Sequence, residues 1–165
     1  MRPTGARTGP RSAPSATTIT FPPDPPMTDS RATDRRWQPV TLGPDVPPPA
    51  GAYSPGVRAG DLLFVSGQVP KDPRTGAVVG DEVREQARQV LRNLEAVLAA
   101  GGATLADVVS VTVWLQDEGD WGAFNEVYKS VFSPPYPTRA VVGAQLRGIL
   151  VEVAAIAYLG APAGR

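Results

Sequence analysis

Apolar residues recur with two different periods between residue 57 and residue 157. A helical period predicts a long helix over residues 83–98, stopped by Gly101 and Gly102, because its apolar positions share one face. A second helix over residues 121–132 carries an aromatic stripe, interpreted as core, and Asp120 is its predicted N-cap. Period-two alternation predicts strands over residues 108–115, 137–142 and 149–157, and residues 57–65 resemble a hairpin that turns at 59–61.

These elements follow the order β-β-α-β-α-β-β, which predicts a single α+β domain with a mixed sheet and two helices on one face. Two helices cover only one face of such a sheet. The other face would carry apolar side chains, either Val151, Val153, Ala155 and Ala157 or the alternate set. An apolar face left open on a small domain indicates a partner, most simply another copy of the chain. We therefore expect a homo-oligomer.

Proline divides the chain into a tail and a domain. Residues 1–49 hold most of the prolines together with many Arg, Ser and Thr residues, which predicts a disordered tail. We place the folded domain at residues 50–160 and a short second tail at 161–165. The start lacks the apolar core of a secretory signal, and no run of 18 apolar residues could span a membrane. These features predict a cytoplasmic protein that does not bind membranes.

Composition excludes several kinds of chemistry. The chain has no cysteine and no histidine, so disulfides, thiol nucleophiles, Ser-His triads and the usual zinc ligands are ruled out. Phosphate-binding glycine loops and clusters of metal ligands are also missing from the sequence, so we predict neither a cofactor nor a metal. Residues 50–160 carry nine basic and twelve acidic residues, a net charge of −3, which argues against a nucleic-acid partner.

Two isolated charges stand in the last two apolar runs. Arg139 begins one predicted strand, and Glu152 lies within the next, on the face it shares with Leu150, Ala154 and Ile156. A lone charge is costly to bury unless it meets a partner or a ligand. One hypothesis is that both residues line a single cleft, where one holds a carboxylate and the other handles water. The alternative, a structural ion pair between them, fits the sequence equally well.

Six short stretches together resemble the reactive-intermediate deaminase family, RidA or YjgF, over residues 50–159. They are GAYSP (51–55), FVSGQVP (64–70), QARQVLRNL (86–94), NEVY (125–128), PTR (137–139) and VEVAAIA (151–157). The resemblance implies a chorismate-mutase-like fold and a homotrimer with clefts between subunits. It also implies hydrolysis of 2-imino acids, such as 2-iminobutanoate and 2-iminopropanoate, to 2-oxo acids and ammonia.

The same resemblance assigns roles to individual residues. Arg139 would bind the substrate carboxylate, and Glu152 would position or activate water. The substrate-binding pocket would include Tyr53, Ser66, Gly67 and Asn125. Two alternatives to an imine deaminase remain. One is a non-catalytic, carboxylate-binding or chaperone-like trimer, and the other is an endoribonuclease.

The chain departs from the family pattern near the arginine. The departures are Ala140, Gly143 and a short loop at residues 145–148 that contains Arg147. They bear on the substrate range more than on the reaction class.

Overall fold

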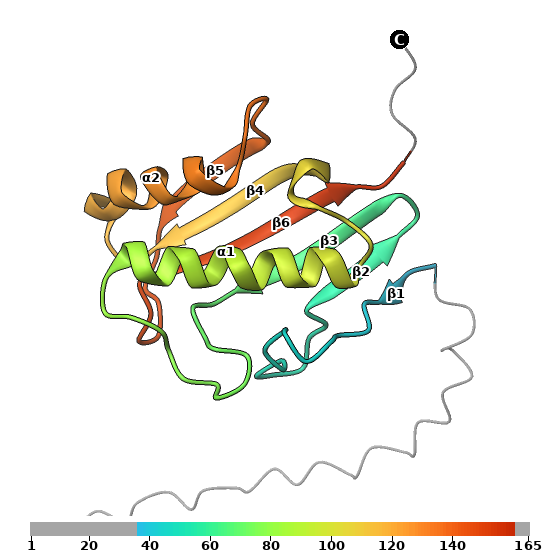
Figure 1. Cartoon of the computed structure of the whole chain (residues 1–165), viewed down its shortest axis with the longest axis horizontal. Coiled ribbons are helices and arrows are strands. Elements are labelled where there is room, and N and C mark those ends of the chain that lie inside the picture. Colours follow the sequence, from blue (N-terminus) through green and yellow to red (C-terminus); the bar gives the residue numbers. More distant parts are fainter. Residues whose placement is uncertain (1–35, 161–165) are drawn as a thin grey trace, which may run out of the picture. The chain divides into compact units, whose positions relative to one another are not determined.

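The computed structural model describes residues 36–160, so residues 1–35 of the tail predicted over 1–49 and all of the tail predicted over 161–165 lie outside this range. Six strands and two α-helices make up the described part of the chain (Figure 1). The strands are β1 (Gln38–Pro39), β2 (Gly56–Ala59), β3 (Leu62–Gln68), β4 (Val108–Leu115), β5 (Thr138–Gly143) and β6 (Val151–Tyr158). The helices are α1 (Val83–Ala100) and α2 (Trp121–Val131), and two short 3₁₀ helices are η2 (Leu105–Asp107) and η3 (Glu118–Asp120).

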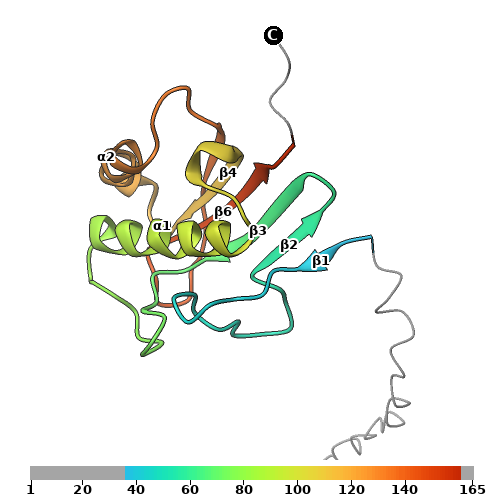
Figure 2. The same cartoon turned by 45° about the vertical axis from the view of Figure 1, so that its right-hand side comes forward.

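The strands form one mixed sheet in the order β1-β2-β3-β6-β4-β5. Only β4 and β5 are parallel, and every other pair is antiparallel. Both α-helices lie on the same side of this sheet (Figures 1 and 2). The prediction of an α+β domain with two helices on one face of a mixed sheet is confirmed.

Helix α1 forms where the apolar spacing predicts it. Its apolar stripe is fully buried, and the arginines of the opposite side are exposed. The helix ends at Gly101, and Gly102 follows with a φ of 81°, a left-handed conformation that glycine adopts without strain.

Strand β6 alternates strictly between the two faces of the sheet. Val151, Val153, Ala155 and Ala157 are buried beneath the helices, and Glu152 lies on the open face with Ala154 and Ile156. The open face also presents large apolar side chains that are 36% to 48% exposed: Leu62, Phe64, Val142 and Tyr158. The sheet therefore has one dry face and one face that is apolar and uncovered within a single chain.

Strand β4 differs from the predicted alternation at its start. Strict alternation placed Val109 with Val111, Val113 and Leu115, but Val109 is exposed and Val108 is buried. The register of β4 against β6 shifts between Val108 and Ser110, so an irregularity at this point changes which side chain faces inward.

The sheet begins before the predicted domain boundary. Strand β1 pairs with β2, Gln38 opposite Arg58 and Pro39 opposite Val57. Val46 is also part of the buried core. Proline-rich composition led us to place the domain start near residue 50, whereas residues 38–46 contribute a short edge strand and one core side chain.

Helix α2 begins at Trp121 with Asp120 at the N-cap position, as predicted, but the side-chain cap differs from the prediction. Asp120 precedes the helix in a helical conformation, and its side chain makes no capping hydrogen bond. Asp117 instead accepts a hydrogen bond from the amide of Gly119, at 2.8 Å, and caps η3. The side-chain cap therefore lies at the start of the 3₁₀ turn, three positions before Asp120.

Three buried polar side chains of α1 hold the loops around it. Asn93 donates to the carbonyls of Val69 and Lys71, both at 2.8 Å, and accepts from Gln89 at 2.9 Å. Gln86 accepts from the amide of Leu150 at 2.7 Å. These bonds satisfy backbone groups of two loops that would otherwise lose their partners on burial. The segments that lead out of β3 and into β6 are thereby fixed to one helix.

Substituting Asn93 should test how much this network contributes. Asn93→Ala removes the donor for two partly buried carbonyls, so we expect the free energy of unfolding to fall by roughly 1–3 kcal/mol. Urea denaturation followed by circular dichroism measures the change. Glu95→Ala, an exposed position on the same helix, should change stability by no more than about 0.5 kcal/mol. Equal effects of the two substitutions would contradict this role for Asn93.

Candidate functional site

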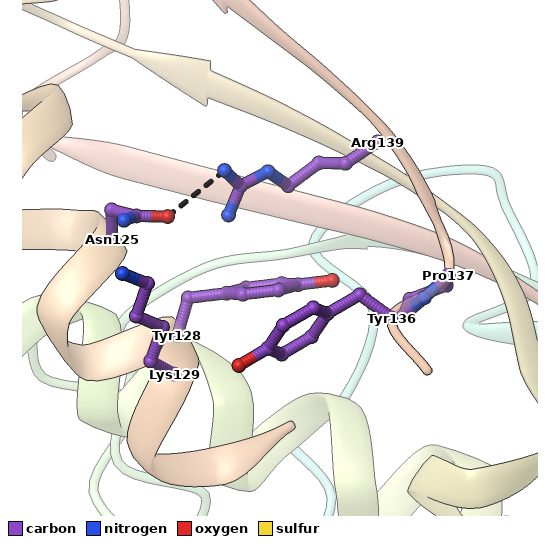
Figure 3. A pocket seen from close by; sticks show the side chains of 6 residues that line it. All are labelled: Asn125, Tyr128, Lys129, Tyr136, Pro137 and Arg139. Carbon is purple, nitrogen blue, oxygen red and sulfur yellow. Dashed lines mark hydrogen bonds between the residues drawn. The ribbon is translucent and has the colours of Figure 1, made fainter. Parts of the chain in front are cut away.

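Arg139 reaches from the edge strand β5 towards helix α2 (Figure 3). It lies opposite Val111, whose side chain is buried beneath the helices, so Arg139 is on the helix side of the sheet. Its Nη2 donates to Oδ1 of Asn125 at 2.9 Å. The guanidinium carbon lies 4.4 Å from the ring centre of Tyr128 and 5.9 Å from that of Trp121. An amide and two aromatic rings thus fix the direction of the cation.

Two polar atoms in this arrangement are buried without a hydrogen-bond partner. They are Nη1 of Arg139 and the hydroxyl of Tyr128. Burial raises the pKa of Tyr128, an effect that the neighbouring charge of Arg139 opposes. Buried polar groups are nearly always satisfied, so each unsatisfied atom requires an explanation. Each of these atoms therefore has a hydrogen bond to offer that the described chain does not use.

A pocket of about 340 Å³ lies at these atoms. Its lining consists of Asn125, Tyr128, Lys129, Tyr136, Pro137 and Arg139 (Figure 3). Two residues of this lining are cations, and none is acidic. A guanidinium with a free donor in an acid-free pocket is suited to bind a carboxylate, because its planar fork matches the two carboxylate oxygens.

Some aromatic residues of α2 lie in the core, and others lie at the candidate site. Phe124 and Phe132 are buried in the core as predicted. Trp121 is 48% exposed, so its assignment to the core was wrong. Tyr128 is buried, but its ring supports Arg139 and its hydroxyl is unsatisfied, so it belongs to the site as well. The i, i+3 spacing of Asn125 and Tyr128 was a usable signal, because it places an amide and a ring on one helix face.

Glu152 belongs to a second cluster, on the open face. The register of β3 against β6 shifts between Val65 and Gln68, which brings the backbone of Gly67 against the Glu152 side chain. A Cβ atom at residue 67 would overlap the Glu152 carboxyl oxygen, so a larger residue at this position would displace the Glu152 carboxyl group. Ser66 lies beside them, and its hydroxyl donates to the carbonyl of Ser54 at 2.7 Å.

The Glu152 carboxyl group is half-buried and has no hydrogen-bond or ion-pair partner among residues 36–160. Burial raises its pKa above the ordinary value of 4.5. A carboxyl group whose pKa is raised in this way is a typical candidate for acid-base chemistry.

Tyr53 lies near this second cluster. It lines a small pocket of about 40 Å³ together with Gly67, Gln68 and Lys71. Its hydroxyl accepts from the amide of Ala50 at 3.2 Å, and its side chain is 48% exposed. The six residues predicted for the site therefore fall into two groups: Arg139 with Asn125, and Glu152 with Gly67, Ser66 and Tyr53.

The two groups lie on opposite faces of the sheet within one chain. Glu152 lies opposite Trp114 on the open face, whereas Arg139 lies on the helix side. The hypothesis that Arg139 and Glu152 line one cleft is therefore wrong for a single chain. The ion-pair alternative is wrong as well, since the one salt bridge in the described part of the chain joins Arg84 to Glu126. A site that uses both groups requires two copies of the chain.

Two further observations concern residues 36–160. Neither α-helix combines the length and the apolar character that crossing a membrane would require. Within the same residues, acidic side chains do not gather in groups of three or more that could hold a metal ion.

Comparison with known proteins places the chain in a family. The sequence profile described as "Endoribonuclease L-PSP" matches residues 44–159. A RutC family protein of Pyrococcus horikoshii is 43% identical over 121 residues, covering 72% of this chain and 96% of the relative. A mouse protein named 2-iminobutanoate/2-iminopropanoate deaminase is 42% identical over 116 residues, covering 69% and 86%.

A solved structure agrees with these relatives. The crystal structure of RidA from the Antarctic bacterium Psychrobacter sp. PAMC 21119 superposes with a TM-score of 0.70 at 34% identity, covering 73% of this chain and 99% of that one. Sequence and fold thus lead to the same group of proteins, and the chain belongs to the Endoribonuclease L-PSP family, also called RidA or YjgF.

Proposed function

We propose that the protein hydrolyses 2-imino acids to 2-oxo acids and ammonia in a cleft between two copies of the chain. The observation that carries this proposal is the buried, unsatisfied Nη1 of Arg139 in a pocket without acidic residues. The names of relatives such as the mouse deaminase, at 42% identity, supply the reaction class.

Arg139 is the anchor for the substrate carboxylate. Its Nη1 is free to donate, while Asn125 and the ring of Tyr128 hold the guanidinium plane in place. Fixing the carboxylate also fixes the adjacent carbon of the C=N bond. Positioning of this kind lowers the entropic part of the barrier to attack by water.

Glu152 handles the water. Its carboxylate accepts a proton from the water molecule whose oxygen adds to the C=N carbon, which forms a carbinolamine. Glu152 then returns that proton to the nitrogen and the C–N bond breaks, so that ammonia leaves. The hydroxyl oxygen gives up its proton to Glu152 as the C=O bond forms. A carboxyl group with a raised pKa is suited to both proton transfers, because it is neither strongly acidic nor permanently charged.

The second copy brings the two groups together. Glu152 lies on the uncovered face among exposed apolar side chains such as Phe64 and Val142, a surface suited to another subunit. Arg139 lies on β5, at the free edge of the sheet, where a neighbouring subunit can approach it. A homotrimer, which the family resemblance implies, would repeat this contact in a closed ring.

Replacing Arg139 tests the anchor directly. We expect Arg139→Ala to lower kcat/KM for 2-iminopropanoate by about 100- to 1,000-fold, because the charge-assisted hydrogen bond from Nη1 and the attraction of the guanidinium charge for the carboxylate are both lost. Arg139→Lys, which keeps the charge but not the fork, should retain part of the activity. Arg88→Ala, on the exposed side of α1, is the control and should be fully active. Ammonia release from imine generated in situ gives the rates.

One result would contradict the catalytic proposal. Wild-type protein that does not accelerate imine hydrolysis would reject it. If such a protein still bound small carboxylates through Arg139, the non-catalytic binding trimer would be the better description.

The raised pKa of Glu152 predicts how stability depends on pH. The folded chain binds the Glu152 proton more tightly than the unfolded chain, so ionisation weakens folding as pH rises through the raised pKa. Glu152→Gln removes this penalty. We expect the variant to melt at a higher temperature than wild type at pH 7, with the difference shrinking as pH falls through the raised pKa and vanishing by about pH 4.

Differential scanning calorimetry at several pH values measures this difference. Glu95→Gln, an exposed carboxyl on α1, serves as the control and should show no such trend. A lower melting temperature for Glu152→Gln at pH 7 would mean that the ionised carboxylate stabilises the folded protein, and a raised pKa of Glu152 would then be wrong.

A further inference from the structure

The Arg139 pocket contains a second cation. Lys129 lies one helical turn after Asn125, on the same face of α2, and both residues line the pocket with Arg139 (Figure 3). Since Asn125 is hydrogen-bonded to the guanidinium, this spacing places the Lys129 ammonium group at the same pocket. The lysine side chain is exposed, so its ammonium group is accessible to a ligand.

No acidic residue of the described chain neutralises Lys129. It takes part in no ion pair among residues 36–160, and no acid is present in the pocket lining. The nearest acid in sequence on α2 is Glu126, which is already paired with Arg84 at 2.8 Å. Within one chain the pocket therefore carries two positive charges and no negative charge.

One carboxylate does not use all the donors that this pocket offers. A single carboxylate that binds Arg139 satisfies the free Nη1 and neutralises one charge. The Tyr128 hydroxyl and the Lys129 ammonium group are then still available as donors. The pocket volume of about 340 Å³ leaves room for a substrate side chain beyond the anchored carboxylate.

We propose that the preferred substrates are 2-imino dicarboxylates of four or five carbons. The carboxylate next to the C=N bond binds Arg139, and the distal carboxylate binds Lys129. The reaction is the one proposed above: a 2-imino dicarboxylate and one water give the 2-oxo dicarboxylate and ammonia. This inference rests on the proposed function and makes Lys129 its specificity-determining residue.

The test compares two substrates of equal chain length. 2-Iminosuccinate carries a distal carboxylate where 2-iminobutanoate carries a methyl group, and an amino-acid oxidase generates each imine in situ. Semicarbazide traps the imine that the protein has not yet hydrolysed. The loss of trapped imine at increasing protein concentration therefore gives kcat/KM for each substrate. We expect wild type to prefer 2-iminosuccinate, and Lys129→Met to lower that preference by about tenfold.

Two further variants separate charge from shape. Lys129→Arg keeps the positive charge and should keep the preference for the diacid. Arg88→Met removes an exposed charge of α1 outside the pocket and should leave both rates unchanged. Calorimetric binding of succinate and butanoate gives a readout that does not depend on turnover, and Lys129→Met should weaken succinate binding selectively.

The outcomes distinguish this inference from the function on which it rests. A wild type that hydrolyses 2-iminobutanoate better than 2-iminosuccinate would overturn the inference and leave the deaminase proposal intact. So would a Lys129→Met variant that loses both activities equally, because the lysine would then act on the shared carboxylate. A wild type inactive on both imines would overturn the deaminase proposal itself.

Discussion

The site depends on one cation that is held in place without being neutralised. Arg139 is bound by a neutral amide, Asn125, and stacked against Tyr128 and Trp121, and none of these removes its charge. A carboxylate partner in the same chain would have made Arg139 a structural ion pair and closed the site to an anionic ligand. The buried free nitrogen shows the consequence, since the fold leaves one donor for a molecule that the chain does not supply.

The fold fixes this arrangement through two helices on one side of the sheet. Helix α2 presents Asn125 and Tyr128 to the edge strand β5, and α1 holds the neighbouring loops with Gln86 and Asn93. The same arrangement leaves the other face open, with Glu152 and Gly67 among exposed apolar side chains. The two faces of the sheet thus have different roles. The face covered by the helices supplies the core that stabilises the fold, and the uncovered face carries the second group of candidate residues.

Much of the fold followed from local patterns along the chain. The 3.6-residue period of α1, the alternation of β6 and the hairpin at Gly60 are set by neighbouring residues, so the sequence was sufficient to predict them. The errors occurred where pairing decides the outcome. The irregularity at Val109, the short strand β1 and the cap at Asp117 depend on register or on a 3₁₀ turn, and periodicity does not report either.

The sequence by itself determined which groups are available: no histidine, no cysteine, and single charges at Arg139 and Glu152 in strands that otherwise avoid charge. Only the tertiary structure decided where these groups point. Strand alternation fixes relative faces within one strand, but the face on which β5 presents Arg139 depends on its parallel pairing with β4 and on the packing of α2. For this reason the structure separated two residues that the sequence had grouped together, and it added Tyr128 and Lys129 to the pocket.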